Sequence, residues 1–326
     1  MAGGAVVAIL GATGVLGEQL LEVLEDVDAV GAVIPVARAT SEQSEVSFRG
    51  ERVEVVALKD DDVERADVIV SALPGRLGRE PLDRLIEEGI PVIDLAGVFG
   101  TSAPIVASGV RGEVGAIRET GVVTSPRPLA LALAKLLRTL SEFGVHGVTG
   151  TALCPAGIAG REGVKELSGQ VVAVFNSQEP PRRVFTKGLA FDLLPSWGAV
   201  GEKGWSGHEL MVAIQLGLLA GIDPARVSVD MVVAPLFAGT GVSLRLLLSE
   251  GWELSKVVEV LKESDGFKLS SDPMPRRSIG RDELTVGRIR QDLGGGALHL
   301  WLSFDPQRLA ARAAADLVED LLRGEA

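Results

Sequence analysis

Short apolar runs alternate with helix-like periodic segments in the N-terminal part of the chain. Ala5–Leu10 is compact and apolar, which predicts a buried strand. The next segment places apolar residues along one helical face, at Leu16, Leu20, Val23, Leu24 and Val27. Further strands are predicted over residues 32–37, 67–72, 91–95 and 122–124, and helices over residues 81–88 and 129–140. This alternation predicts crossover connections and a parallel sheet with helices on both faces.

The second half of the chain has longer and less regular connections. Strands are predicted over residues 147–153, 171–175, 227–233, 242–248 and 297–304, and the last two alternate in polarity. Helices are predicted over residues 209–219, 253–262 and 306–322, and residues 264–281 have the prolines and paired arginines of a surface loop. We therefore predict an α/β protein whose second sheet is mixed or mostly antiparallel.

Composition narrows the classes of partner. A net charge of −12 argues against nucleic acid as a partner, because binding it needs a basic face. The longest uncharged segment is shorter than a membrane span and contains Pro235, so no membrane partner is expected. The single cysteine, Cys154, permits neither an intrachain disulfide nor a multi-cysteine metal site. The N-terminus lacks the basic region of a signal peptide, and a cytoplasmic location is expected.

A glycine-rich turn lies between the first predicted strand and the first predicted helix. Its sequence is Gly11-Ala12-Thr13-Gly14-Val15-Leu16-Gly17. In such a loop one glycine makes the tight turn, one lets backbone N–H groups approach a pyrophosphate, and one lets the helix pack on the strand. The spacing departs from the standard dinucleotide fingerprint, but the strand–turn–helix context is the one that fingerprint requires. We predict cofactor binding by Gly11, Thr13, Gly14, Val15, Leu16 and Gly17.

The end of the second strand bears on which dinucleotide is bound. An NAD site commonly has Asp or Glu there, for the ribose hydroxyls. This chain instead has Arg38, Thr40 and Ser41, which suit a 2′-phosphate and favour NADP. An ordinary polar loop after a strand explains the same residues equally well.

Several motifs, taken in order along the chain, resemble those of the aspartate-semialdehyde dehydrogenases. They are the glycine loop, Ser71-Ala72, Val92-Ile93-Asp94 with Phe99, Gly160-Arg161-Glu162-Gly163, and Val286-Gly287-Arg288-Ile289-Arg290-Gln291-Asp292. The resemblance implies an NADP-binding Rossmann-like domain of residues 1–127 and 307–326, in which Ser71 and Ala72 also contact the cofactor. It further implies a mixed-sheet dimerisation domain of residues 128–306, and a homodimer.

The resemblance also implies a chemistry whose parts this chain lacks. In the family a cysteine thiolate attacks the aldehyde, hydride passes to NADP, phosphate releases the thioester, and a histidine is the acid/base partner. The nucleophile's position falls on Pro128, within Ser125-Pro126-Arg127-Pro128, the histidine's on Thr240, and the substrate-binding arginine's on Gly100. Three further places differ from the family. Val233 stands where the family has an arginine, and Cys154 stands where it has a glutamine. The family's Asp-Asn-Ser-Ser turn is replaced here by Asp94-Leu95-Ala96-Gly97.

With these replacements the chain resembles a Usg-like branch of the family, whose members lack the catalytic residues. We therefore predict no catalytic residue, and a pseudoenzyme that retains NADP or another nucleotide and acts as a binding or regulatory homodimer. The alternative is an active NADP-dependent oxidoreductase that acts on an aldehyde or carbonyl without a cysteine. A third hypothesis is a purely structural dimer with an empty loop.

The remaining reactive residues have ordinary interpretations. A lone cysteine after an apolar strand, such as Cys154, is usually a small buried hydrophobe. The spacing of His146, His208 and His299 shows no metal signature. Arg127 is interpreted either as an anion-binding residue beside the cofactor or as a solvated surface arginine.

Overall fold

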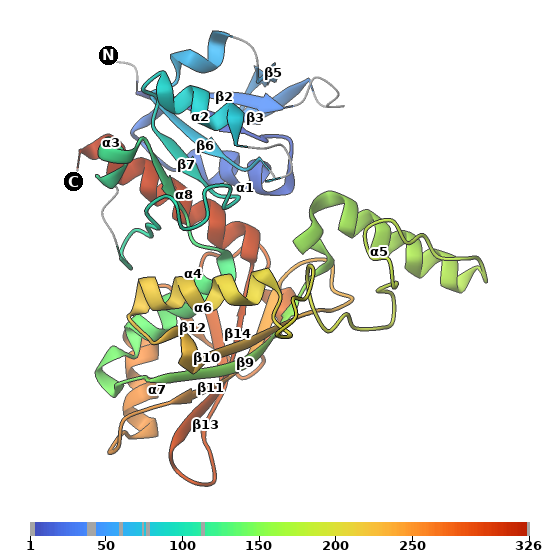
Figure 1. The fold of residues 1–326 in the computed structure, drawn as a ribbon, viewed down its shortest axis with the longest axis vertical. Helices are drawn as coiled ribbons and strands as arrows, with labels where there is room; N and C mark the ends of the chain where they lie inside the picture. Colours follow the sequence, from blue (N-terminus) through green and yellow to red (C-terminus); the bar gives the residue numbers. More distant parts are fainter. Residues whose placement is uncertain are drawn as a thin grey trace. The chain divides into compact units, whose positions relative to one another are not determined.

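The computed structural model describes residues 4–37, 44–58, 61–73, 75, 79–111 and 115–324. The chain divides into two compact units (Figure 1). Unit 1 consists of Met1–Leu131 and Gln307–Ala326, and unit 2 consists of Ala132–Pro306. In the described part of the chain, each unit is built on a six-stranded sheet of its own.

Unit 1 is built on a parallel sheet with strand order β5-β2-β1-β6-β7-β8. Each neighbouring pair of strands in it runs parallel. This confirms the parallel sheet predicted from the alternating pattern, since parallel neighbours need crossover connections. The strands are β1 (Ala5–Leu10), β2 (Val30–Ala37), β5 (Val56–Ala57), β6 (Val68–Ser71), β7 (Val92–Asp94) and β8 (Val122–Thr124).

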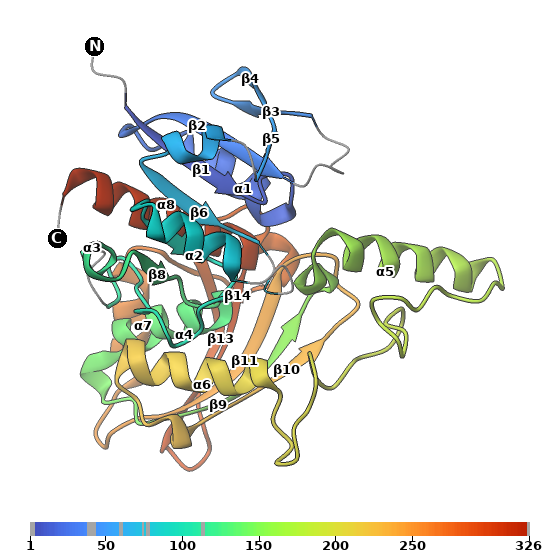
Figure 2. The same cartoon turned by 45° about the horizontal axis from the view of Figure 1, so that its top comes forward.

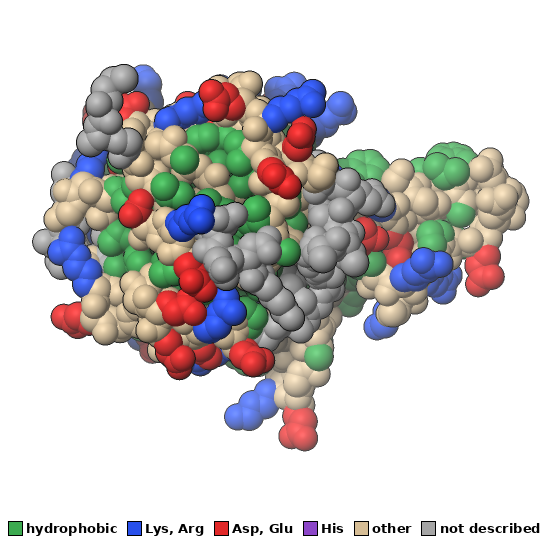
Figure 3. All heavy atoms as spheres, turned by 90° about the horizontal axis from the view of Figure 1, so that it is seen from above, with side chains coloured by type: hydrophobic (Ala, Val, Ile, Leu, Met, Phe, Trp, Pro, Cys, Tyr) green, Lys and Arg blue, Asp and Glu red, His purple; other side chains and the backbone are tan. Residues whose placement is uncertain are grey.

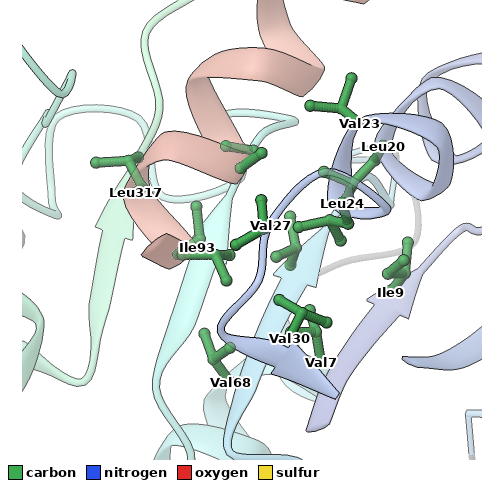
Figure 4. Packing of buried hydrophobic residues seen from close by; sticks show 14 of the residues in the cluster. Val7, Ile9, Leu20, Val23, Leu24, Val27, Val30, Val68, Ile93 and Leu317 are labelled. Atoms are coloured by element: carbon green, nitrogen blue, oxygen red, sulfur yellow. The ribbon is translucent and has the colours of Figure 1, made fainter. Parts of the chain in front are cut away.

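Helices cover both faces of this sheet. One face packs against α1 (Val15–Leu24), α3 (Ala116–Thr120) and α8 (Pro306–Arg323). Figure 4 shows this apolar cluster, whose labelled residues are Val7, Ile9, Leu20, Val23, Leu24, Val27, Val30, Val68, Ile93 and Leu317. The opposite face packs against α2 (Glu80–Glu87) through Leu82 and Leu85. The predicted helical cover on both faces is therefore confirmed.

The C-terminal helix α8 is part of the core of unit 1. Two ion pairs join it to α1 or the turn after it: Arg308 Nη1 lies 2.9 Å from Glu22 Oε1, and Arg312 Nη2 lies 3.4 Å from Asp26 Oδ2. Exposed pairs of this kind contribute little stability by themselves. The apolar face of α8 buries Ala311, Ala314, Ala315, Leu317 and Val318 in this cluster, and this burial supplies most of the attachment.

A two-stranded hairpin in unit 1 is not predicted by the sequence pattern. It consists of β3 (Glu45–Phe48) and β4 (Glu51–Glu54), and most of its side chains are exposed. Arg49, at its turn, has a φ of 49°, and its guanidinium donates to the backbone oxygens of Glu25, Val27 and Val30 at 3.1, 2.9 and 2.8 Å. These bonds hold the hairpin against the α1–β2 connection, and an apolar pattern could not reveal them.

Unit 2 is built on a mixed sheet with strand order β10-β9-β11-β14-β13-β12. The β9–β10 and β12–β13 pairs are parallel and the other pairs antiparallel, which confirms the predicted mixed sheet. Residues 264–281 are not entirely the predicted loop, because β12 forms a short edge strand within them. The strands are β9 (Gly147–Cys154), β10 (Val227–Val233), β11 (Thr240–Leu247), β12 (Phe267–Leu269), β13 (Leu284–Gln291) and β14 (Ala297–Phe304).

The two faces of this second sheet differ in burial. On β11, Val242, Leu244 and Leu246 are buried, whereas Ser243 is exposed and Arg245 is partly exposed. Helices α6 (Gly207–Ala220) and α7 (Leu254–Glu263) lie against strands of the sheet and account for its buried face. We call the other side the open face; it carries Thr149, Thr151, Ser228, Asp230, Ser243, Arg245, His299 and Trp301, all exposed or partly exposed.

Helix α5 (Gly160–Phe175) and the chain after it form an arm that projects from unit 2 in both Figures 1 and 2. We define the arm as residues 160–200. The predicted strand over residues 171–175 is wrong, because these residues are the last turn of α5. Their valine and phenylalanine content favours a strand locally. The helix is nevertheless stabilised because its upstream side chains bind the chain that returns along it.

Two buried side chains of α5 make those contacts. Glu166 accepts hydrogen bonds from three consecutive backbone N–H groups, of residues 183–185, at 2.7–2.8 Å. Gln170 Oε1 accepts from Leu189 N and Ala190 N, at 2.7 and 2.9 Å. Residues four apart lie on one face of a helix, so both side chains reach the same returning segment. If α5 ended before these two residues, the five N–H groups of the returning segment would lose their hydrogen-bond acceptors.

The arm is expected to lose protection from hydrogen exchange as Glu166 is protonated. Burial raises the pKa of Glu166, but the N–H groups of residues 183–185 outweigh it and hold the pKa below its usual 4.5. A lowered folded-state pKa means that this stabilisation is present above the unfolded-state pKa and is lost as pH falls through the folded-state value. Amide protection of residues 183–185 should therefore be constant near neutral pH and should fall only in acid, as pH drops below the ordinary titration range of a glutamate.

Two variants test this dependence. In Glu166→Gln the amides of residues 183–185 should exchange faster at neutral pH, and their protection should no longer change with acidification. The control is Glu162→Gln, since Glu162 is an exposed α5 residue whose carboxylate only approaches Lys165 Nζ at 3.7 Å. Equal protection in wild type and Glu166→Gln at neutral pH would contradict the assigned role.

Candidate nucleotide site and the adjoining strand ends

The glycine loop makes a tight turn from β1 into α1. Gly11 has a φ of 90°, a conformation that residues with a Cβ rarely adopt. Its N–H and that of Ala12 both donate to Val36 O, at 2.8 and 3.1 Å. Gly14 N then donates to Gly11 O at 2.9 Å. Gly11 therefore makes the turn and fixes the loop to the end of β2.

Gly17 lets the helix pack directly on this loop. A Cβ at position 17 would lie 2.3 Å from Gly11 O and 2.6 Å from Ala12 Cα. Such distances are too short for any side chain, and the atoms in the way belong to the backbone. The start of α1 can approach the turn this closely only because residue 17 is glycine.

Gly14 leaves the N-terminus of α1 accessible. It is the N-cap residue, and no side chain caps the helix. A Cβ at position 14 would meet one atom within 4 Å, Gly11 O at 3.2 Å, so the other side of Gly14 is open. First-turn N–H groups, such as those of Val15, Leu16 and Gly17, have no acceptor within their helix. Bare backbone at a helix N-terminus fits the pyrophosphate of a dinucleotide.

The end of β6 lies next to the glycine loop. Ala72 N donates to Leu10 O at 2.9 Å, which sets Ser71 and Ala72 beside the end of β1. Ser71 is buried, and its Oγ accepts from Leu73 N at 3.4 Å. The structure thus brings six predicted loop residues and these two to one edge of the sheet. Arg38, Thr40 and Ser41 lie outside the described residues, so the preference for NADP stays a prediction.

Strand β7 ends in a buried carboxylate. Asp94 Oδ1 accepts from Ala96 N and Gly97 N, and Oδ2 accepts from Phe99 N, each at 3.0 Å. Burial raises the pKa of Asp94, and these backbone N–H groups oppose the rise. Asp94 therefore holds the turn after β7, which ends at Gly100, the position where the resemblance implies an arginine.

Strand β8 leads directly into helix α4 (Pro128–Thr139). Ser125 N donates to Asp94 O at 2.9 Å, which continues the pairing with β7. Leu131 N donates to Arg127 O at 2.9 Å, so Arg127 caps the helix and Pro128 is its first residue. Arg127 is partly buried, so it is not a solvated surface arginine. Burial lowers its pKa, and Asp94 opposes that change.

Cys154 lies at the end of β9 in unit 2 and cannot act as a thiolate. It is buried on the helix-covered side of the sheet, and its Sγ lies 3.9 Å from Ala152 O. Burial raises the pKa of the thiol to about 12. Since the thiolate is the reactive form, this environment makes Cys154 inert at neutral pH. The interpretation of Cys154 as a small buried hydrophobe is confirmed.

The other positions of interest in unit 2 are also ordinary. Thr240 begins β11 and Val233 ends β10, and both are buried. His208 lies in the first turn of α6, with its ring 6.2 Å from that of Trp197, while His146 Nδ1 lies 3.2 Å from Gly144 O. Among the described residues, no group of three or more His, Cys, Asp or Glu could hold a metal ion.

Family models match both halves of the chain. Residues 6–116 match the NAD-binding domain of semialdehyde dehydrogenase, and residues 138–306 match its dimerisation domain. The chain belongs to the semialdehyde dehydrogenase family. Its parallel and mixed sheets are the Rossmann-like and dimerisation folds of that family, and a nicotinamide dinucleotide is the family's cofactor class.

Similar members of the family have two kinds of name. An aspartate-semialdehyde dehydrogenase of Rickettsia bellii is 26% identical over 330 residues, and a USG-1 protein homolog of Azotobacter vinelandii is 31% identical over 331; each match covers 97% of both chains. Aspartate semialdehyde dehydrogenase II of Vibrio cholerae has a TM-score of 0.92 at 25% identity, covering 98% of this chain and 99% of that one. The family resemblance is confirmed, and its Usg-like form is supported.

No helix in the described ranges has both the length and the apolar character needed to cross a bilayer. On the face seen in Figure 3, Lys and Arg side chains are interspersed with Asp and Glu. The charge on this face is therefore mixed rather than gathered into one basic area.

Proposed function

We propose that this chain is a dinucleotide-binding member of the semialdehyde dehydrogenase family that does not catalyse phosphorylating oxidation of an aldehyde. The observation that carries the proposal is Pro128 as the first residue of α4. The resemblance places the family's thiol at this position. Proline has neither a nucleophilic side chain nor an N–H group to hold an oxyanion.

The other parts of the family chemistry also lack a replacement. Cys154 is the single thiol of the chain, and its burial and raised pKa keep it protonated at neutral pH. Thr240 stands where the resemblance implies the histidine, and a threonine hydroxyl does not titrate near neutral pH as an imidazole does. Gly100 stands where it implies an anion-binding arginine. Loss of nucleophile, acid/base partner and anion ligand together supports an inactive family reaction.

The retained part is the dinucleotide loop. Gly11, Gly14 and the first turn of α1 would hold the pyrophosphate, and Ser71 and Ala72 would border it. We propose NADP over NAD because Arg38, Thr40 and Ser41 suit a 2′-phosphate. A bound nicotinamide would supply a hydride donor or acceptor. No side chain placed here supplies the thiol that the family reaction also needs.

We propose that the protein is a homodimer through the open face of unit 2. The match to a dimerisation domain supports this, as does the row Thr149, Arg245 and His299, which pair in register across three strands. Sedimentation velocity should show a dimer for the wild type and a shift to monomer for Ser243→Arg, which places a long charged side chain on that face. Ser141→Arg, at an exposed serine outside the sheet, should leave the dimer intact.

Calorimetry and an absorbance assay test the proposed function together. NADP should bind the purified protein saturably, with a Kd in the range of ordinary cofactor and substrate constants, about 1 μM to 1 mM. In the same preparation, aspartate semialdehyde, phosphate and NADP should produce no NADPH above the protein-free rate. Absence of NADP binding would refute the cofactor part, and turnover that disappears in Cys154→Ala would refute the inactive-site part.

A further inference from the structure

A cavity of about 450 Å³ lies at the β10 edge of unit 2, whereas the glycine loop belongs to unit 1. One wall is a loop of residues 195–205, which runs from the end of the arm towards α6, and another is β10 itself. The volume lies within the range of small-molecule sites, about 300–1,000 Å³. Six lining residues decide what the cavity can hold: Pro195, Val200, Lys203, Trp205, Glu209 and Asp230.

The loop that forms this wall is fixed by backbone hydrogen bonds. Just before it, Leu194 N donates to Val233 O at 3.0 Å and Val233 N donates to Leu194 O at 2.9 Å. Near its other end, Gly201 N donates to Trp205 O at 2.9 Å. The cavity is therefore formed by ordered backbone before any ligand binds.

Glu209 ties the loop to β10, and its carboxylate is occupied by doing so. Its Oε2 accepts from Ser206 N at 2.8 Å, and its Oε1 accepts from Met231 N at 3.0 Å. The exposed side chains of Lys203 and Asp230, by contrast, form no hydrogen bond or ion pair with each other or with any other residue that the structure describes. Two opposite charges thus line one cavity without neutralising each other.

The rest of the lining includes uncovered apolar surface. Val200 is 50% exposed, and Trp205 is partly exposed. Pro195 adds a third apolar side chain. An indole ring also attracts a cation that lies over its face. The cavity therefore combines an apolar surface with one anionic and one cationic side chain.

We propose that this cavity binds a free α-amino acid with an apolar side chain. The ammonium group pairs with Asp230 and the Trp205 ring, and the carboxylate pairs with Lys203. The apolar side chain covers Val200 and Pro195. A zwitterion fits better than a simple anion or cation, because it leaves neither Lys203 nor Asp230 without an opposite charge. The site goes beyond the proposed function, since it uses no residue assigned to the dinucleotide.

Leucine and two analogues that each lack one charged group test this assignment by calorimetric and NMR titration. L-Leucine should bind saturably, with a Kd of about 1 μM to 1 mM. 3-Methylbutylamine lacks the carboxylate, and 4-methylpentanoate lacks the ammonium group. Each analogue should bind at least tenfold more weakly than leucine, as expected for loss of a charge-assisted contact.

Two variants assign the charged groups of the ligand to the protein. Lys203→Gln should weaken leucine binding at least tenfold and leave the binding of 3-methylbutylamine unchanged, whereas Asp230→Asn should weaken the binding of both. Lys268→Gln and Asp265→Asn are matched controls and should bind leucine normally. Both control residues are exposed and lie in or just before β12, at the opposite edge of the same sheet.

The monomeric variant Ser243→Arg separates this site from the proposed dimer. Asp230 belongs to the open face, but every lining residue of the cavity comes from one chain. Ser243→Arg should therefore bind leucine as the wild type does. Loss of leucine binding in Ser243→Arg, no saturable binding to the wild type, or equal weakening in Lys203→Gln and Lys268→Gln would overturn the proposal. NADP binding and the dimer are measured separately, so each of these results leaves the proposed function standing.

Discussion

Cys154 in the native protein is expected to react with a thiol reagent such as dithiobis(nitrobenzoate) at least about a thousandfold more slowly than an exposed cysteine at pH 7.5. Burial raises the pKa of the thiol from its usual 9.0 to about 12, which lowers the thiolate fraction by about three orders of magnitude. Restricted access to the buried sulfur slows the reaction further. The measurement is the absorbance time course of the released thiolate under native conditions.

Unfolding provides the positive control for this measurement. In concentrated guanidinium chloride the single thiol should react fully and quickly, because its pKa and access return to ordinary values. Cys154→Ser gives the background rate in both conditions. Rapid reaction of the folded wild type would show an exposed or activated thiol, and it would reopen the possibility of thiol catalysis.

Gly17→Ala is expected to destabilise the protein by about 2–4 kcal/mol and to weaken dinucleotide binding at least tenfold. The added Cβ would lie 2.3 Å from Gly11 O and 2.6 Å from Ala12 Cα, so backbone atoms of the loop must move. The moved atoms belong to the same turn that would hold the pyrophosphate. Denaturant unfolding gives the change in free energy, and calorimetric titration with NADP gives the change in Kd.

Gly169→Ala is the matched control for this effect. Gly169 lies within α5 of unit 2, and a Cβ there would make an ordinary 3.4 Å contact with Pro181 Cγ. Alanine is the better helix former by about 0.5–1 kcal/mol, so this variant should be as stable as the wild type or more stable. Normal stability and normal NADP affinity in Gly17→Ala would contradict the close packing of α1 on the loop.

The fold was largely predictable where apolar periodicity carries the information. Ala5–Leu10 and residues 297–304 were predicted within their observed bounds, because buried strands show directly in the pattern. The β3–β4 hairpin was missed because exposed charged residues dominate its short strands. The last turn of α5 was mistaken for a strand because hydrogen bonds made by Glu166 and Gln170, distant along the chain from their partners, outweigh local preference.

The candidate site was predictable to a different degree in each of its parts. The glycine loop stands out because its turn and its helix contact both require glycine. The resemblance identified Pro128, Thr240 and Gly100 as the residues that replace the family's functional ones, since aligning the motifs shows which residue stands at each position. The burial of Arg127 and its lowered pKa could not be predicted. Both depend on the turn after β7 and on Asp94, about thirty positions upstream in the chain. The unpartnered hydroxyl of Ser125 is likewise visible only when all neighbouring atoms are placed.

The sequence by itself determined the α/β class, the family, the dinucleotide loop and the absence of a thiol at position 128, because residue type and spacing carry this information. Only the tertiary structure decided that Cys154 is an inert buried thiol and that Arg127 is held against the turn after β7. The physical reason is that hydration and hydrogen bonding depend on every atom nearby. Most of those atoms come from segments far away in the chain.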